Sequence, residues 1–177
     1  YCYCESRIKM LAPRKKLWPT PIYVIESALD LAGVTRDDVV LDLGCGDGRV
    51  LITAATKCGA RAVGYEINAA RAAEARAAAE AAGVAHLVDI RVGNALEADL
   101  DEIRPTVAIL FLIERGLRAA IPMLAAGPNP TRVCTYTYAI PKGVLADLGA
   151  GAGMKLWCQD PKCADRKVPL HYYTFAG

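Results

Sequence analysis

Residues 39–49 read Val-Val-Leu-Asp-Leu-Gly-Cys-Gly-Asp-Gly-Arg, an apolar run that ends in three alternating glycines. The continuous run Val39–Leu43 is typical of a strand buried on both faces of a parallel sheet. A turn over Gly44–Gly48 then leads into a predicted helix over Arg49–Lys57, which ends near Gly59. Alternating glycines permit a sharp turn and let a ligand approach backbone N–H groups at the start of a helix. This order predicts a cofactor site at the end of the strand.

The acid in this stretch separates two classes of cofactor. The dinucleotide fingerprint G-x-G-x-x-G would need a glycine at position 49, where the chain has Arg49. The pattern is instead D-x-G-x-G-x-G, with Asp42 two residues before the first glycine. A carboxylate at this place repels a pyrophosphate but not a cationic sulfonium. The sequence therefore favours S-adenosylmethionine over a nicotinamide dinucleotide.

Strands and helices alternate along the rest of the chain. A helix is expected to start at Thr20-Pro21, with Thr20 as N-cap, and an Ala-rich helix to start at Asn68 and end at Gly83. The apolar stripe of the first helix comprises Ile22, Ile25, Ala28, Leu29 and Ala32. Further strands are expected over 61–66, 87–92, 106–113 and 132–140, with a helix over 114–126 before the last of these. A terminal antiparallel pair is expected over 154–158 and 168–175, joined by a loop of about ten residues.

This alternation predicts an α/β fold, a doubly wound parallel sheet with helices on both faces. Such a sheet binds its ligand at the carboxyl ends of the strands. Glu66, at the end of the second strand, is placed to accept both ribose hydroxyls of a cofactor, although a solvated Glu is the alternative. The side chain of Asn94, after the third strand, is placed to accept from an adenine amino group, with the N–H of Ala95 beside a ring nitrogen. A turn-forming Asn without a ligand is the alternative there.

Asp42-x-Gly44-x-Gly46-x-Gly48, Glu66 and Gly93-Asn94 together resemble the seven-stranded class I S-adenosylmethionine-dependent methyltransferases, over about residues 20–175. The resemblance implies strand order 3-2-1-4-5-7-6 with the last strand antiparallel. Pro19-Thr20-Pro21, Leu-Gly-Cys-Gly-Asp-Gly-Arg at 43–49 and Gly-Tyr-Glu-Ile-Asn at 64–68 are similar to a narrower family of small protein-lysine methyltransferases. That family includes broad-specificity archaeal enzymes and mitochondrial enzymes acting on ATP synthase subunit c and the adenine nucleotide translocase.

The narrower resemblance implies S-adenosyl-L-methionine as cofactor, S-adenosyl-L-homocysteine as product and a protein with an exposed lysine as substrate. The cofactor-binding residues that it implies are Asp42, Gly44, Cys45, Gly46, Glu66, Ile67, Asn94, Ala95, Thr20 and Tyr23. Asn94 stands where many class I enzymes have Asp. No Asn/Asp-Pro-Pro-Tyr/Phe sequence follows the fourth strand, and by resemblance this argues against methylation of adenine N6 or glutamine amides.

Candidate catalytic residues follow the fourth and fifth strands. Tyr136 and Tyr138 are two apart and are expected on one face of the fifth strand, with Tyr138 in a channel for an incoming ammonium. Glu114 is a candidate to bind that ammonium or relay its proton, and a first-turn Glu favoured by the helix dipole is the alternative. Thr20 and Tyr23 are expected to close over the methionine end of the cofactor, with Trp18 as a lid anchor or a staple.

The composition bounds the remaining classes. The chain has 177 residues with 54% hydrophobic content, which predicts a single domain over 20–177. Residues 1–19 carry no clean periodicity and are expected to form an arm. A net charge of +2 does not favour nucleic acid, and no apolar run reaches the ~18 residues of a membrane span. The seven cysteines are expected to be reduced. The spacings of Cys2-x-Cys4 and Cys158-x4-Cys163, with His171, fit zinc knuckles poorly, so no metal is expected. The expected compartment is the cytoplasm, or the mitochondrion by family analogy if a segment precedes Tyr1.

Three functions remain open from the residues. The first is a protein-lysine methyltransferase. The second is another class I methyltransferase that acts on a small molecule or RNA. The third is a module that binds the cofactor and transfers nothing.

Overall fold

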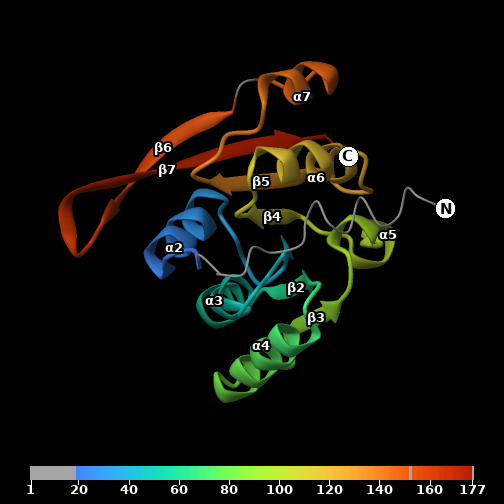
Figure 1. Ribbon diagram of the computed structural model, residues 1–177, viewed down its shortest axis with the longest axis vertical. Helices are drawn as coiled ribbons and strands as arrows, with labels where there is room; N and C mark the ends of the chain where they lie inside the picture. The colour runs from blue at the N-terminus through green and yellow to red at the C-terminus, as the bar shows by residue number, and fades with distance from the viewer. Residues whose placement is uncertain (1–18, 152, 177) are drawn as a thin grey trace.

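The computed structural model describes residues 19–151 and 153–176, which form a seven-stranded sheet flanked by helices (Figure 1). The strand order is β3-β2-β1-β4-β5-β7-β6. The strands are β1 Val39–Leu43, β2 Arg61–Glu66, β3 Val88–Val92, β4 Val107–Leu110, β5 Thr131–Tyr136, β6 Met154–Asp160 and β7 Cys163–Phe175. β1 to β5 are parallel, and β7 is antiparallel to both of its neighbours. The predicted doubly wound fold and its strand order are confirmed.

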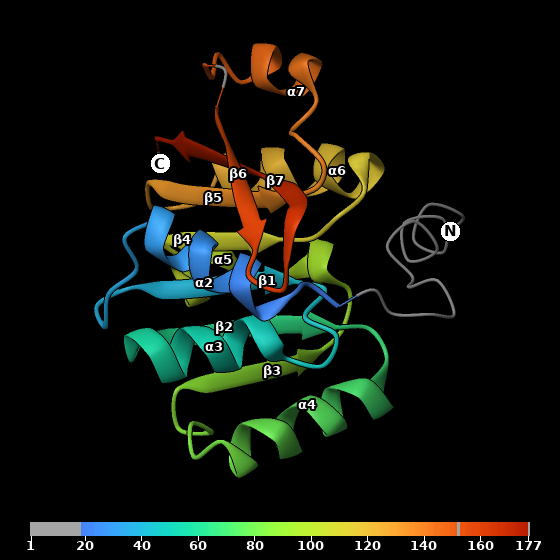
Figure 2. The same ribbon diagram turned by 90° about the vertical axis from the view of Figure 1, so that its left-hand side faces the viewer.

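Helices cover the two faces of the sheet as separate layers. The first layer consists of α2 Ile22–Leu31, α3 Arg49–Cys58 and α4 Ala69–Ala81. The second consists of α5 Leu100–Ile103, α6 Glu114–Ala125 and α7 Lys142–Asp147, with the short 3-10 helix η1 Ala95–Glu97 before α5. Figure 2 shows α2 and α3 in front of the sheet and α6 behind it. Successive strand residues alternate between the two cores, so that Val40 belongs to the first and Leu41 to the second.

The elements around the glycine-rich turn lie where the sequence predicts them. β1 and β2 have the predicted bounds, and α3 ends one residue later than expected, at Cys58. Asn68 caps α4, where its side chain accepts from the backbone N–H groups of Ala70 and Arg71. These elements carry the strongest local signals, a continuous apolar run and a capping residue.

The start of α2 differs from the prediction. Pro21, with ψ at 142°, takes the N-cap position without a side-chain hydrogen bond, so the expectation that Thr20 caps this helix is wrong. Ile22 is 46% exposed, and Val24 is buried in its place beside Ile25. The buried face therefore comprises Val24, Ile25, Ala28 and Leu29.

The ends of β4 and β5 also differ from the prediction. β4 stops at Leu110 rather than at residue 113, and β5 stops at Tyr136 rather than at residue 140. Thr137 has a φ of 69°, which turns the chain out of the strand. Tyr138 N donates to Tyr136 O across 2.8 Å, which closes a three-residue turn. Tyr136 and Tyr138 therefore do not share one face of a strand.

The terminal hairpin is longer than expected. β6 and β7 continue to a turn at Pro161 and Lys162, where the sequence predicts a polar loop of about ten residues. α7 and the short helices η1 and α5 were not predicted. No helix in the described part of the chain is long and apolar enough to cross a membrane. The expected arm, Trp18, Cys2 and Cys4 lie outside the described residues.

Candidate active site

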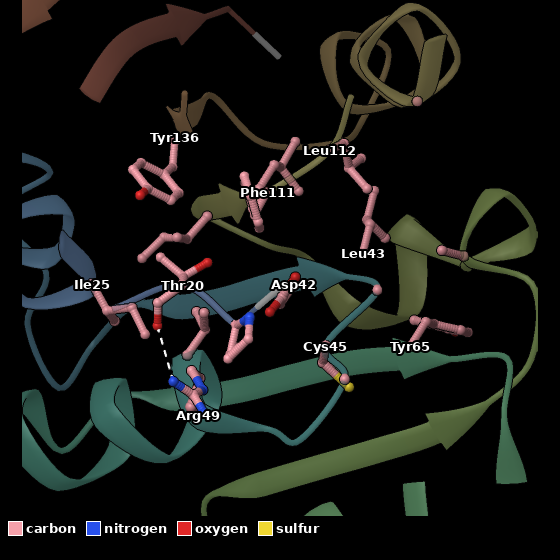
Figure 3. A pocket seen from close by; sticks show the side chains of 18 of the residues that line it. Thr20, Ile25, Asp42, Leu43, Cys45, Arg49, Tyr65, Phe111, Leu112 and Tyr136 are labelled. Atoms are coloured by element: carbon pink, nitrogen blue, oxygen red, sulfur yellow. Dashed lines mark hydrogen bonds between the residues drawn. The ribbon is translucent and has the colours of Figure 1, made fainter. Parts of the chain in front are cut away.

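A cavity of about 580 Å³ opens at the carboxyl ends of β1, β2, β4 and β5. This is the edge at which a doubly wound sheet binds ligands, and the volume is within the ~300–1,000 Å³ of small-molecule sites. In Figure 3, Asp42 lies between Arg49 on one side of the cavity and the rings of Phe111 and Tyr136 on the other. The cavity thus has an acidic half on β1 and β2 and an aromatic half on β4 and β5.

Asp42 and Glu66 are the buried acids of the acidic half, at 5% and 4% exposed. No described residue donates a hydrogen bond to the carboxylate of Asp42. Burial, followed by the nearby charges of Asp47 and Glu66, raises the pKa of Asp42 to about 7. A buried carboxylate without a donor or a cation is costly, and a positively charged ligand relieves that cost.

Glu66 is held by the backbone at the end of β2. Its Oε2 accepts from Gly46 N across 3.1 Å, and its Oε1 accepts from Asn68 N across 2.8 Å. Gly46 has a φ of 56°, a conformation that favours glycine. Gly64 of β2 packs against the turn, where a Cβ would lie 2.8 Å from the Cβ of Cys45. The glycine-rich turn is therefore pressed against β2, with Glu66 in the cavity wall.

Most backbone N–H groups of this turn are already bonded. Those of Gly44 and Cys45 donate to Tyr65 O, that of Gly48 donates to Cys45 O and that of Arg49 donates to Asp47 Oδ1. A pyrophosphate site needs such groups free at the helix start. With the N–H of Gly46 bound to a carboxylate as well, the turn suits a cofactor that brings hydroxyl donors and a cation, which fits S-adenosylmethionine.

Of the remaining residues predicted to bind the cofactor, some line the cavity and one does not. Thr20, Ile67, Asn94 and Ala95 line the cavity together with Gly44, Cys45 and Gly46. Asn94 Oδ1 accepts from Leu96 N across 3.1 Å as the cap of η1, so its adenine contact stays a prediction. Tyr23 is not among the lining residues. Its hydroxyl is buried without a partner in the described chain, and burial and the charge of Asp160 raise its pKa.

Arg49 is a lining residue that the sequence analysis gave no role. Its guanidinium forks onto the carboxylate of Asp47 and donates to Thr20 O across 3.2 Å. These bonds join the entry of α2 to the glycine-rich turn over the cavity. The local signal was only an arginine directly after the last glycine, and its partner Thr20 is 29 residues away.

The aromatic half lies at the ends of β4 and β5. The ring centroids of Phe111 and Tyr136 are 4.9 Å apart, and Ile113 and Tyr138 continue the wall to the surface, where Tyr138 is 43% exposed. The carboxylates of the described lining all belong to the acidic half. Glu114 is not a lining residue, and it forms an exposed ion pair with Arg118 on α6.

Thiol and metal chemistry find little support in the described residues. Cys45 is in the cavity wall, but burial and the charges of Asp42 and Glu66 raise its pKa, which keeps the thiol protonated. No group of three His, Cys, Asp or Glu side chains that could hold a metal is found in the described chain. Cys158 and His171 occupy opposite faces of the β6–β7 pair, because their cross-strand partners are Val168 and Lys155.

A seven-stranded sheet of this order, with a glycine-rich turn after β1 and buried acids after β1 and β2, defines a class I S-adenosylmethionine-dependent methyltransferase. A family model described as the ANTKMT methyltransferase domain matches residues 42–144. The chain belongs to the ANTKMT methyltransferase family.

Individual relatives agree with this assignment. A protein-lysine N-methyltransferase of Saccharolobus islandicus (strain REY15A) is 41% identical over 133 residues, which cover 72% of this chain and 81% of the relative. An RNA methyltransferase from Salinibacter ruber, solved in complex with S-adenosyl-L-homocysteine, is 32% identical with a TM-score of 0.75 and covers 90% of this chain and 94% of its own. An O-methyltransferase from Thermotoga maritima, 15% identical with a TM-score of 0.69, covers 97% and 71% and shows the fold alone.

Proposed function

We propose that this methyltransferase acts on the side-chain amine of a protein lysine. The archaeal relative named above is a protein-lysine N-methyltransferase, and it shares 41% of its aligned residues with this chain. The observation that carries the proposal is the division of the cavity. One half holds buried carboxylates for a cationic cofactor, and the other is an aromatic passage that reaches the surface at Tyr138.

The acidic half supplies the contacts to the cofactor. Glu66 faces the ribose hydroxyls, since its two backbone donors already fix the carboxylate. Asp42 faces the positive charge of the methionine part, and Ile67, Asn94 and Ala95 enclose the base. S-adenosylmethionine supplies an activated methyl group on a sulfonium, so that the protein contributes mainly alignment and exclusion of water.

The aromatic half prepares the acceptor. A lysine amine must lose a proton before it can attack a methyl carbon, and an apolar passage lowers the pKa of an ammonium by desolvation. The faces of Tyr136 and Tyr138 attract the ammonium as it enters. Because Glu114 is paired with Arg118 outside the cavity, the passage itself, rather than a carboxylate, favours the neutral amine.

RNA is the second candidate acceptor, because the relative from Salinibacter ruber is named an RNA methyltransferase. The two candidates differ in where the methyl group goes. The enzyme is incubated with a cell extract and labelled S-adenosylmethionine, and the products are digested separately with protease and with ribonuclease. Label in methyl-lysine that survives ribonuclease is the expected result. Label that only ribonuclease releases would overturn the lysine proposal in favour of RNA.

A further inference from the structure

The β6–β7 hairpin extends beyond the edge of the sheet at which the cavity opens (Figures 1 and 2). β7 pairs with β5 only over residues 170–175, and Leu170 opposite Tyr136 is the last pair. Beyond this pair, β7 pairs with β6 alone, and it bulges between Cys163 and Lys167, which lie opposite Asp160 and Gln159. At ~3.3 Å per residue, the four residues 157–160 of β6 project roughly 13 Å past the end of β5.

The two faces of this projection differ. Cys158, Val168 and Leu170 share one face, which packs toward α2 in the first core. The opposite face carries Lys155 and Trp157 of β6 and Lys167 of β7, since Trp157 lies opposite Pro169 and Gln159 lies opposite Lys167. Lys155, Trp157 and Lys167 are exposed, and we call them the hairpin face.

The hairpin face is chemically unusual for an edge strand. Trp157 is 56% exposed, and Lys155 Nζ lies 4.3 Å from the centre of its ring. Neither Lys155 nor Lys167 has a carboxylate partner among the described residues, whereas Arg166 is paired with Asp160. An exposed tryptophan beside these two lysines offers apolar contact and positive charge to a binding partner.

The hairpin face is linked to the mouth of the cavity through the backbone turn at Thr137. Trp157 lies opposite Pro169, and Pro169 O accepts from Thr137 N across 3.1 Å. Thr137 is the centre of the turn that presents Tyr138. Thr135 lies opposite His171, which lies opposite Lys155, so the side chain of Thr135 is on the same face as Trp157. Its Oγ1 donates to Tyr138 O across 2.6 Å, so the turn leads the chain toward that face. A substrate whose lysine enters at Tyr138 therefore has its flanking residues close to the hairpin face.

We infer that the hairpin face is a docking site for an acidic segment of the protein substrate, next to the lysine that is methylated. The inference rests on the proposed lysine activity and names the substrate class for it. Two free ammonium groups complement carboxylates, and Trp157 supplies apolar contact between them. RNA is less favoured, since Lys155 already covers one face of the ring on which a base would stack.

Two peptides test the inference. Each carries a single lysine, flanked by glutamates in one and by glutamines in the other. The wild-type enzyme is expected to methylate the acidic peptide with a kcat/KM about tenfold higher, and the preference should shrink as salt screens the charges. Lys155→Glu/Lys167→Glu should abolish this preference and leave turnover of the neutral peptide within twofold. Trp157→Ala should raise KM for the acidic peptide with little change in kcat.

A matched variant controls for net charge. Arg36→Glu/Arg61→Glu makes the same change in charge on exposed residues at the amino edge of the sheet, and the preference for the acidic peptide should survive it. Equal turnover of both peptides by the wild type, or equal loss in the two double variants, would overturn the docking site while the lysine activity stands. Label on RNA with none on either peptide would overturn the lysine activity, and the docking site with it.

Discussion

Asp42 combines burial, two acidic neighbours and the absence of a donor among the described residues, so we expect its protonation to control cofactor binding. With a pKa of about 7, the carboxyl group is largely protonated in the free protein below neutral pH. A cationic ligand binds the ionised form, so binding must release the proton. Cofactor affinity should therefore rise with pH up to about 7 and level off above it.

The expected change is about a tenfold weaker affinity at about pH 6 than at about pH 8. Calorimetric titration of S-adenosylmethionine at both pH values measures it. Asp42→Asn should bind weakly at both, without the slope. A wild-type affinity that does not change across neutral pH would contradict this role of Asp42.

The same carboxylate should cost the free protein stability. Its folded pKa lies above the unfolded value of 3.8, so between these values the native state keeps a proton that the unfolded state releases. Stability is then lost as pH rises from about 4 to 7, and the cost is complete above 7. Asp42→Asn should raise the free energy of unfolding by ~2–4 kcal/mol at about pH 8 and by less at about pH 5.

Urea unfolding of the free protein at both pH values measures this gain. Asp37→Asn, on an exposed residue just before β1, is the matched control and should change stability little. A loss of stability in Asp42→Asn at both pH values would show that the carboxylate is satisfied in the free protein.

Among the elements, the link between α2 and α3 depends on Arg49. Its donation to Thr20 O holds the entry of α2 over the cavity, while Asp47 in the glycine-rich turn fixes the guanidinium. We expect Arg49→Lys to weaken cofactor affinity about tenfold, equivalent to ~1.4 kcal/mol, because an ammonium does not reproduce the fork. As a positioning residue, Arg49 should affect cofactor affinity and leave KM for the acceptor unchanged.

Calorimetry and initial rates separate these two quantities. Arg118→Lys, which alters an exposed ion pair on α6, is the matched control and should change neither. Equal effects of Arg49→Lys on cofactor affinity and acceptor KM would point to general loosening of the cavity.

Elements with strong local signals could be predicted from the sequence, and those set by distant partners could not. β1 and β2 are central strands whose continuous apolar runs mark both ends. β5 ends at Tyr136 because Thr137 has a positive φ of 69°. A β-branched residue rarely adopts this conformation, so the sequence did not indicate it. The outer half of the β6–β7 hairpin is polar and exposed, and only cross-strand pairing makes it a strand.

The candidate site shows the same division. Asp42, Glu66 and the glycines follow strands whose ends could be located, and they line one cavity. Glu114 and Tyr23 were placed by their distance along the chain from a strand or helix end, and neither lines it. Arg49 was missed because its partner Thr20 belongs to another element.

For the whole molecule, the proposed function assigns the two substrates to different ends of the sheet: the acids of the cavity lie at β1 and β2, and Phe111, Tyr136 and Tyr138 lie at the ends of β4 and β5. Substitutions in the two halves should therefore affect different constants. Glu66→Gln should weaken cofactor affinity at least tenfold, because it removes a charge and a hydrogen-bond acceptor. The KM for the methyl acceptor should be unchanged. Tyr138→Ala should raise acceptor KM three- to tenfold, as expected for ~1 kcal/mol of cation–π attraction, with cofactor affinity unchanged.

Tyr138→Phe is the control for the ring, since it keeps the aromatic face and removes only the hydroxyl. It should retain the wild-type KM, whereas a KM like that of Tyr138→Ala would assign the role to the hydroxyl. The measurements are cofactor titration and initial rates with a lysine peptide at saturating cofactor. If Glu66→Gln and Tyr138→Ala each change both constants by similar factors, the two halves are coupled, and the separation seen in the cavity does not extend to binding.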